Sequence, residues 1–140
     1  MIHGTAEGDV HPHVTFVITA HERLEQGDMA AINDMFAADI VWHEFGTSPL
    51  AGKYIGRDDV MAFWKTYFAA AGPGFRQGIR SVMANDEYAS SIVELSGTKS
   101  AATLTQTAVD VMRMVDGRIA EFWRYYADLG QVNEYFSAAP

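Results

Sequence analysis

Hydrophobic and polar positions divide the chain into a helical first half and a strand-rich second half. Apolar residues recur at helical spacing in three segments, which are residues 14–27, 28–38 and 56–71. Gly27 suits the end of the first helix and Asp28 the cap of the second, because Gly tolerates a left-handed backbone and Asp accepts from free N–H groups. The pattern then predicts a short apolar strand, Ile40 to Phe45, followed by a loop punctuated by Gly and Pro.

The second half of the chain alternates between strand patterns and turn signals. Four segments have the apolar and β-branched pattern of strands, namely residues 75–83, 88–96, 102–115 and 118–126. Turns between them are expected at Asn85-Asp86, Gly97-Thr98 and Asp116-Gly117. A short helix over residues 128–136 follows. Helices followed by an antiparallel meander predict an α+β fold, in which a bent sheet wrapped around a helix leaves a pocket.

Composition indicates one globular domain with an apolar interior. The chain has 140 residues, of which 49% are hydrophobic and 20% are charged. A chain of this length buries roughly two thirds of its unfolded surface, so one domain over residues 14–140 is expected after a flexible leader over residues 1–13. Eight Phe, six Tyr, three Trp and seven Met suit both a core and the adaptable walls of a hydrophobic cavity.

Charge and missing motifs exclude several classes of function. The net charge of −8 and the pI near 4.9 disfavour nucleic acid and anionic membranes as partners. The sequence has no cysteine, no apolar run of the roughly 18 residues of a membrane span and no signal-peptide pattern, so a cytoplasmic protein is expected. No His and carboxylate set has ligand spacing and no nucleotide-binding motif is complete, so neither a metal nor another cofactor is expected.

Among the titratable side chains within the predicted strands, four are the candidates for catalysis: His43, Glu44, Asp110 and Arg124. Desolvating a carboxylate is costly, so Glu44 faces either water or a cavity with a task for it. Asp110 lies in a strand that is apolar on both faces, and Arg124 is its possible buried partner. Two interpretations stay open. In the first, these residues are structural, either as an ion pair or on an exposed face of the sheet. In the second, they form a functional cluster.

Four stretches of the sequence carry a family resemblance. They are Gly27-Asp28, Phe36-Ala37-Ala38-Asp39 through Trp42-His43-Glu44, Gly52-x-Tyr54-x-Gly56-Arg57 and Asp116-Gly117-Arg118-Ile119. With them the chain resembles the SnoaL-like proteins of the nuclear transport factor two-like superfamily over about residues 14–136. The resemblance implies a cone-shaped, curved mixed sheet, mainly antiparallel, around N-terminal helices, a cystatin-like α+β barrel. It leaves the substrate open, because this fold carries isomerases, dehydratases, cyclases, epoxide hydrolases and non-enzymes.

Within this superfamily, the sequence is similar to ketosteroid isomerase at the positions that carry chemistry. The resemblance places Glu44 at the general base and Asp110 at the protonated acid of the oxyanion hole. It places Tyr126 at a pocket Trp, and Ala20, beside His21, at the Tyr of the oxyanion hole, so that phenol is missing. The other residues expected to contact substrate are Trp42, Tyr54, Trp64, Met112 and Phe122.

Arg124 is the main departure from the isomerase, where the corresponding position is small. A cation beside Asp110 would ionise it, and an ionised carboxylate cannot donate a hydrogen bond. A neutral Asp110 and an Asp110 paired with Arg124 therefore both remain possible at this point, and the shared face of Arg124 and Tyr126 favours the pair.

Two classes of function follow from the sequence and the resemblance. The first is an enzyme that acts on a hydrophobic small-molecule carbonyl compound as an isomerase, polyketide cyclase or aldol-type catalyst, with epoxide hydrolysis by Glu44, Asp110 and Arg124 as a variant. The second is a non-catalytic module for ligand binding or dimerisation. A homodimer is expected in either class, because Trp123 and Tyr125 point away from the predicted pocket and need cover.

Overall fold

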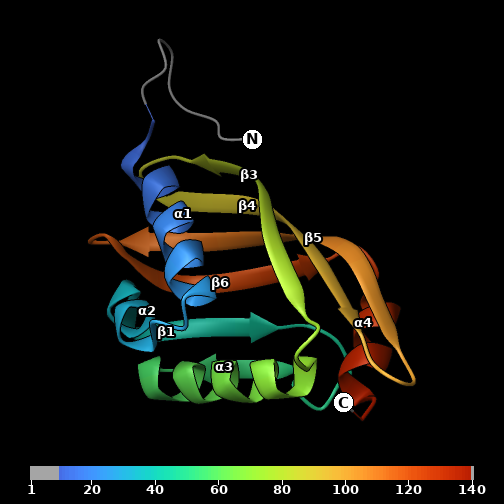
Figure 1. Cartoon of the computed structure of the whole chain (residues 1–140). Helices are drawn as coiled ribbons and strands as arrows, with labels where there is room; N and C mark the ends of the chain where they lie inside the picture. Colours follow the sequence, from blue (N-terminus) through green and yellow to red (C-terminus); the bar gives the residue numbers. More distant parts are fainter. Residues whose placement is uncertain (1–9, 140) are drawn as a thin grey trace.

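Four helices and six strands make up residues 10–139, the part of the chain that the computed structural model describes (Figure 1). The helices are α1 (Pro12–Glu25), α2 (Met29–Met35), α3 (Arg57–Ala71) and α4 (Leu129–Ser137). The strands are β1 (Phe36–Glu44), β2 (Gly52–Ile55), β3 (Arg76–Ala84), β4 (Tyr88–Thr98), β5 (Thr103–Val115) and β6 (Arg118–Tyr126). The predicted α+β class is confirmed.

The six strands form one mixed sheet in the order β2-β1-β6-β5-β4-β3. Strands β1 and β6 are parallel, and all other neighbours are antiparallel. The sheet is curved but does not close on itself, because β2 and β3 remain as its two edges (Figure 1). The curved, mainly antiparallel sheet expected from the resemblance is therefore present in an open form.

Helices α1 and α3 pack against different parts of the sheet and enclose the core with it (Figure 1). Helix α1 contacts β3 and β4, whereas α3 contacts β1 and β2. The side chains of Phe63 and Trp64 on α3 meet Trp42 of β1, whose ring stacks on Phe122 of β6 with 3.7 Å between centroids. Burying each large apolar side chain contributes roughly 1.5–3 kcal/mol, so this aromatic cluster fixes α3 on the sheet.

Two local signals in the sequence form the predicted structures. Asp116 (φ 50°) and Gly117 (φ 74°) both have positive φ between β5 and β6, as a two-residue type I′ hairpin turn requires. The Oδ1 of Asp28 accepts from the Ala31 N–H at 3.1 Å and caps α2. Gly27 lies just before it with φ 72°, a conformation that a side chain disfavours.

The first helix begins within the predicted leader, two residues before its expected start at residue 14. Helix α1 begins at Pro12, and the ring nitrogen Nδ1 of His11 accepts from the His13 N–H at 3.0 Å as its N-cap. Pro is well suited to this position because the first helical N–H groups have no partner in the helix. Residues 1–9 of the expected leader lie outside the described part of the chain.

Three further differences concern strands. Phe36 begins β1 instead of completing the apolar stripe of a helix, and the predicted loop contains the edge strand β2, which pairs with β1. Gly97 lies inside β4 instead of in a turn, and the chain turns after it, where the Lys99 N–H donates to the Ala102 carbonyl at 2.8 Å. Gly97 is in the strand because the Tyr135 ring packs directly over it.

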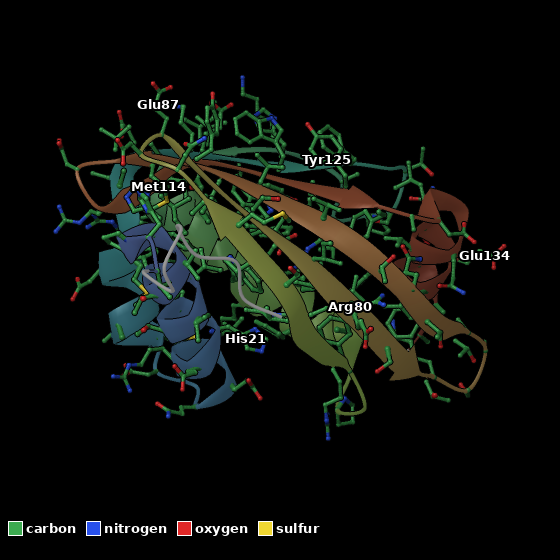
Figure 2. The ribbon with its side chains drawn as sticks, turned by 90° about the horizontal axis from the view of Figure 1, so that it is seen from above. His21, Arg80, Glu87, Met114, Tyr125 and Glu134 are labelled. Carbon is green, nitrogen blue, oxygen red and sulfur yellow. The ribbon has the colours of Figure 1, made fainter. Side chains whose placement is uncertain are left out.

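The face of the sheet opposite the core carries exposed apolar side chains. Val109 is 38% exposed and Tyr125 is 50% exposed, and the two are paired across β5 and β6. Figure 2 shows Tyr125 on the side of the sheet away from His21 of α1. Among the described residues, no helix combines the length and the apolar character that crossing a membrane requires.

Candidate functional site

Strand register brings three of the four candidate catalytic residues into one row across the sheet. Arg124 on β6 is paired with Asp110 on β5 and, on its other side, with Glu44 on β1. Ser91 on β4 continues the row beside Asp110. All four residues are buried. Buried charges need partners, because removing an ion from water costs several kcal/mol even after relaxation.

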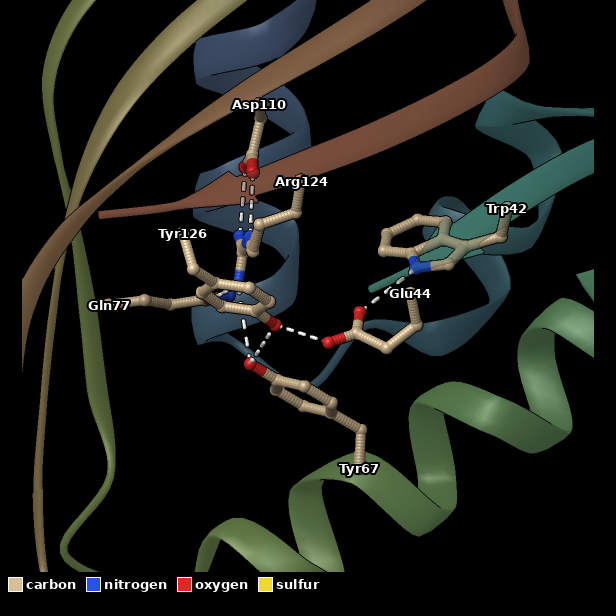
Figure 3. Close-up of polar contacts among 7 residues, drawn as sticks. All are labelled: Trp42, Glu44, Tyr67, Gln77, Asp110, Arg124 and Tyr126. Carbon is tan, nitrogen blue, oxygen red and sulfur yellow. Dashed lines mark hydrogen bonds and ion pairs between the residues drawn. The ribbon is translucent and has the colours of Figure 1, made fainter. Parts of the chain in front are cut away.

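Arg124 and Asp110 form a bidentate ion pair inside the protein (Figure 3). Nε of Arg124 donates to Oδ1 of Asp110 at 2.6 Å, and Nη2 donates to Oδ2 at 2.8 Å. Burial by itself lowers the pKa of Arg124, but the Asp110 carboxylate more than offsets this and holds that pKa well above its ordinary value. Two parallel charge-assisted bonds indicate an ionised pair, so Asp110 is not a neutral hydrogen-bond donor.

The ion pair lines a pocket with otherwise mainly apolar walls. The pocket, counted with the open space at its mouth, measures about 630 Å³. Its walls come from α1, α2 and α3 and from every strand except β2. Six of the eight residues expected to contact substrate line it: Ala20, His21, Trp42, Trp64, Met112 and Phe122.

Four polar side chains of the sheet face this pocket, which are Gln77, Ser91, Asp110 and Arg124. Oε1 of Gln77 accepts from Nη1 of Arg124 at 3.2 Å, which leaves the Gln77 amide nitrogen without a partner among residues 10–139. The Ser91 hydroxyl also lacks a partner within that range. Arg124 has five N–H groups and makes four hydrogen bonds to described residues. The pocket therefore offers free donors beside one carboxylate.

Glu44 is 5% exposed and lies beside the ion pair, but it does not line the pocket. Its Oε2 accepts from the Tyr126 hydroxyl, and its Oε1 accepts from the Trp42 indole N–H at 3.5 Å. Burial raises the pKa of Glu44 above its usual 4.5, and the Tyr126 bond, the Arg124 charge and the Trp42 bond oppose that rise. The carboxyl expected to be the base thus has no direct contact with the pocket.

Two phenols connect Glu44 to the guanidinium of Arg124 (Figure 3). Nη1 of Arg124 donates to the Tyr67 hydroxyl at 3.4 Å, and the hydroxyls of Tyr67 and Tyr126 are 3.4 Å apart. Burial raises the pKa of Tyr67 to about 12 and that of Tyr126 further, so both remain protonated near neutral pH. Tyr126 was predicted to contact substrate. It instead takes part in the series of hydrogen bonds between Glu44 and Arg124 and does not line the pocket.

His43 lies on the opposite face of the sheet from the pocket. Its Nε2 is 2.7 Å from Oε2 of Glu121, and its ring stacks on Trp123 with 5.4 Å between centroids. Tyr54, another residue expected to contact substrate, donates its hydroxyl to the Leu50 carbonyl at 2.6 Å and also lies outside the pocket lining. The structure therefore does not bring His43 or Tyr54 to the candidate site.

His21 lines the pocket from α1, and its Nε2 is 2.8 Å from Oε1 of Glu25 one turn later. His11 and His13, the other histidines of this region, are bonded to Asp86 and to the carbonyl of Asn85. In the part of the chain that the structure describes, no three His, Cys, Asp or Glu side chains are grouped to hold a metal ion.

Sequence reasoning missed Gln77, Ser91 and Tyr67 as parts of this site. Gln77 follows Arg76 and Ser91 follows Ser90, and uncharged polar residues in such a strand usually indicate a solvent-facing position. Tyr67 belongs to the aromatic stripe of α3, which predicts core packing and carries no sign of a hydroxyl partner. Only the pairing of Ser91 with Asp110 in the sheet register could have identified one of them.

Comparisons with known proteins place this geometry in a family context. Residues 17–122 match the family model of the SnoaL-like domain. An uncharacterised protein of Mycobacterium tuberculosis is 26% identical over 113 residues, which cover 80% of this chain and 86% of the relative. A protein of unknown function with a cystatin-like fold from Xanthomonas campestris superposes with a TM-score of 0.82 at 23% identity, covering 89% of this chain and 98% of the other. TerC, co-crystallised with polyporic acid, superposes with a TM-score of 0.77 at 16% identity, covering 91% and 100% of the two chains.

Proposed function

Because the chain belongs to the SnoaL-like domain family, whose fold supports small-molecule isomerases and cyclases, we propose that it is an enzyme acting on a hydrophobic carbonyl compound by acid–base chemistry. The observation that carries this proposal is the ionised Asp110–Arg124 pair in the wall of a mainly apolar pocket. Apolar walls with a few convergent polar groups are typical of small-molecule sites. A buried pair needed only for stability has no reason to face a pocket, since apolar residues would serve there equally well.

The polar groups of the pocket match the needs of proton abstraction next to a carbonyl. In the proposed step, the Asp110 carboxylate takes a proton from the carbon beside the carbonyl, and the C–H electron pair moves to give an enolate oxygen. The free N–H of Arg124, with donors from Gln77 and Ser91, holds this oxygen. Returning the proton to another carbon gives an isomer, and attack of the enolate carbon on a second carbonyl closes a ring.

The two alternative functions are less well supported by the same geometry. Epoxide hydrolysis by a cluster of three charged residues needs Glu44 at the pocket, and Glu44 does not line it. Among the described residues that line the pocket, Asp110 is the one carboxylate. A non-catalytic ligand-binding module uses the same walls, and the activity measurement below distinguishes it from an enzyme.

Binding is tested first, with tryptophan fluorescence as the signal. Trp42 and Trp64 line the pocket, so an aromatic ligand there should quench or shift their emission. Polyporic acid is the starting probe, and native mass spectrometry of the purified protein searches for a bound compound of its own. The control is Trp123→Phe, because Trp123 stacks on His43 on the opposite face and its loss should leave the ligand-induced change intact.

Activity is then measured as exchange of carbon-bound hydrogen for deuterium in D₂O, followed by NMR on the bound carbonyl compound. Measured per folded molecule, because this variant is also expected to be less stable, Asp110→Asn should slow this exchange by about 100-fold or more, the usual contribution of a general base. The control Glu121→Gln makes the same carboxylate-to-amide change on the opposite face and should exchange at the wild-type rate. Binding without exchange in the wild type would reject the enzyme and leave the binding module.

A further inference from the structure

Glu44 is a buried carboxyl for which the proposed proton transfer has no direct use. It does not line the pocket, yet it is connected to Arg124, which does. The connection runs through the hydroxyls of Tyr126 and Tyr67, and it reaches Nη1 of Arg124, while Nε and Nη2 hold Asp110 (Figure 3). Tyr126 and Trp42 each donate to one oxygen of Glu44, yet the hydrogen bonds continue from Tyr126 through Tyr67 to a residue of the pocket wall, and this continuation calls for another explanation.

The direction of the two hydrogen bonds that Tyr126 makes, with Glu44 and with Tyr67, depends on whether Glu44 carries a proton. A phenol has one proton to donate, and a guanidinium can only donate. While Glu44 is ionised, Tyr126 donates to it, so Tyr67 must donate to Tyr126. When Glu44 is protonated and donates to Tyr126, the phenol pair reverses. Tyr67 then accepts from both Tyr126 and Arg124, and neither of these two groups can accept the proton of its own hydroxyl.

We propose that Glu44 is a positioning residue: its proton reverses the two phenol hydrogen bonds and so changes how Arg124 presents its free N–H to the pocket. The reversal alters the acceptor strength of the Tyr67 hydroxyl, which has donated its own proton in one state and accepts two bonds in the other. In the state where Tyr67 accepts two hydrogen bonds, it is the weaker acceptor for Nη1 of Arg124. Because Nη1 is shared between Tyr67 and Gln77, the guanidinium then shifts toward Gln77.

The surroundings of Glu44 allow this proton to come and go in an accessible pH range. The polar and charged groups that face it are Trp42 of β1, Tyr54 of β2, Tyr67 of α3, Asp110 of β5, and Arg124 and Tyr126 of β6. Burial is the largest effect and raises the pKa of Glu44, and nearby Asp110 raises it further, whereas Arg124 and two hydrogen bonds lower it. The balance leaves the pKa above 4.5, so the carboxyl is protonated at a higher pH than an exposed Glu.

Nitrogen-15 NMR of the ligand-free protein tests the inference at both ends of the hydrogen-bonded series, beside Glu44 and at Arg124. The Trp42 indole N–H donates to Glu44 and reports its charge directly. The Nε–H of Arg124, bonded to Asp110, reports the state of the guanidinium. We expect both resonances to shift with pH around one shared midpoint above 4.5, and we expect Glu44→Gln to abolish both shifts.

Two further variants test whether the coupling between Glu44 and Arg124 runs through the phenol hydrogen bonds or results only from the short distance between the two residues. Tyr126→Phe removes the link, so the Trp42 resonance should keep its pH step while the step at Arg124 is lost or falls by more than half. Glu121→Gln, a matched change on the opposite face, should leave both steps unchanged. The inference is overturned if the Arg124 resonance does not follow that of Trp42 in the wild type, or keeps its full step in Glu44→Gln or Tyr126→Phe.

This inference rests on the proposed function only for the ligand oxygen that Arg124 would hold. The NMR measurement uses no ligand, so its result does not depend on whether a carbonyl compound is bound or turned over. A protein without deuterium exchange can still show the coupled titration, and an active enzyme can lack it. Failure of one proposal is therefore distinguishable from failure of the other.

Discussion

The Asp110 carboxylate stabilises the fold because it neutralises a guanidinium that is almost fully buried. Arg124 is 4% exposed and holds Asp110 through two hydrogen bonds of 2.6 and 2.8 Å. Asp110→Asn keeps the shape of the side chain but leaves the Arg124 cation without a counter-charge. We expect the free energy of unfolding, measured by urea denaturation, to fall by about 3–5 kcal/mol.

A surface ion pair on the same sheet is the control for this residue. Nη1 of Arg80 and Oε1 of Glu94 are 3.8 Å apart, and their side chains are 64% and 63% exposed. Glu94→Gln should change the free energy of unfolding by less than about 1 kcal/mol, since water screens the pair. Equal effects of the two substitutions would mean that Asp110 is not the counter-charge of a buried cation.

At the scale of elements, helix α4 is held on β4 by a contact that requires Gly97. A Cβ at Gly97 would lie 2.8 Å from Cζ of Tyr135, whose buried hydroxyl donates to the Ala71 carbonyl of α3 at 2.6 Å. Lys99 strengthens this contact, because its Nζ donates to the Tyr135 carbonyl at 2.7 Å. Gly97→Ala therefore forces the ring outward, and we expect it to lower the free energy of unfolding by roughly 1–3 kcal/mol.

Gly78 of β3 provides the matched substitution for Gly97, because a Cβ there meets no atom within 4 Å. Gly78→Ala should be neutral or stabilising by up to about 1 kcal/mol, since it reduces the freedom of the unfolded chain without a clash. Urea denaturation of both variants makes the comparison. A similar loss at both positions would point to a general intolerance of strand substitution instead of the Tyr135 contact.

At the scale of the whole molecule, we expect a homodimer through the exposed face of the sheet. Tyr125 and Val109 are paired on this face, and Phe45 stacks on Tyr125 with 5.3 Å between ring centroids. A contiguous apolar patch of this kind is unfavourable in water unless another surface covers it. Light scattering at micromolar concentration should give twice the chain mass, and Tyr125→Lys should shift the protein to the monomer.

A control for the dimer places the same charge away from this face. Met29 at the start of α2 is 36% exposed, and Met29→Lys should leave the dimer intact. A monomeric wild type, or equal dissociation by both substitutions, would contradict an interface on the outer face of the sheet.

The sequence by itself determined the elements whose signals are local. The Asp116-Gly117 turn, the cap at Asp28 and the third helix formed as predicted, because turn geometry, capping and apolar periodicity involve residues close in the chain. Alternation along β6 also put Arg124 on the same face as Phe122 and Tyr126, whereas β5 was apolar on both faces and left the direction of Asp110 open. Periodicity fixes the face on which a side chain lies, and this part of the candidate site was accessible without a structure.

Only the tertiary structure decided which inward side chains reach the pocket. Glu44 and Arg124 lie in the same row of the sheet, yet Arg124 lines the pocket while Tyr126, Tyr67 and Trp42 enclose Glu44. Strand β2 and the position of Gly97 likewise depend on contacts with segments far away in the sequence. A local pattern specifies the face of the sheet on which a side chain lies. It does not specify whether that side chain reaches the pocket, because this is set by the packing of distant elements against one another.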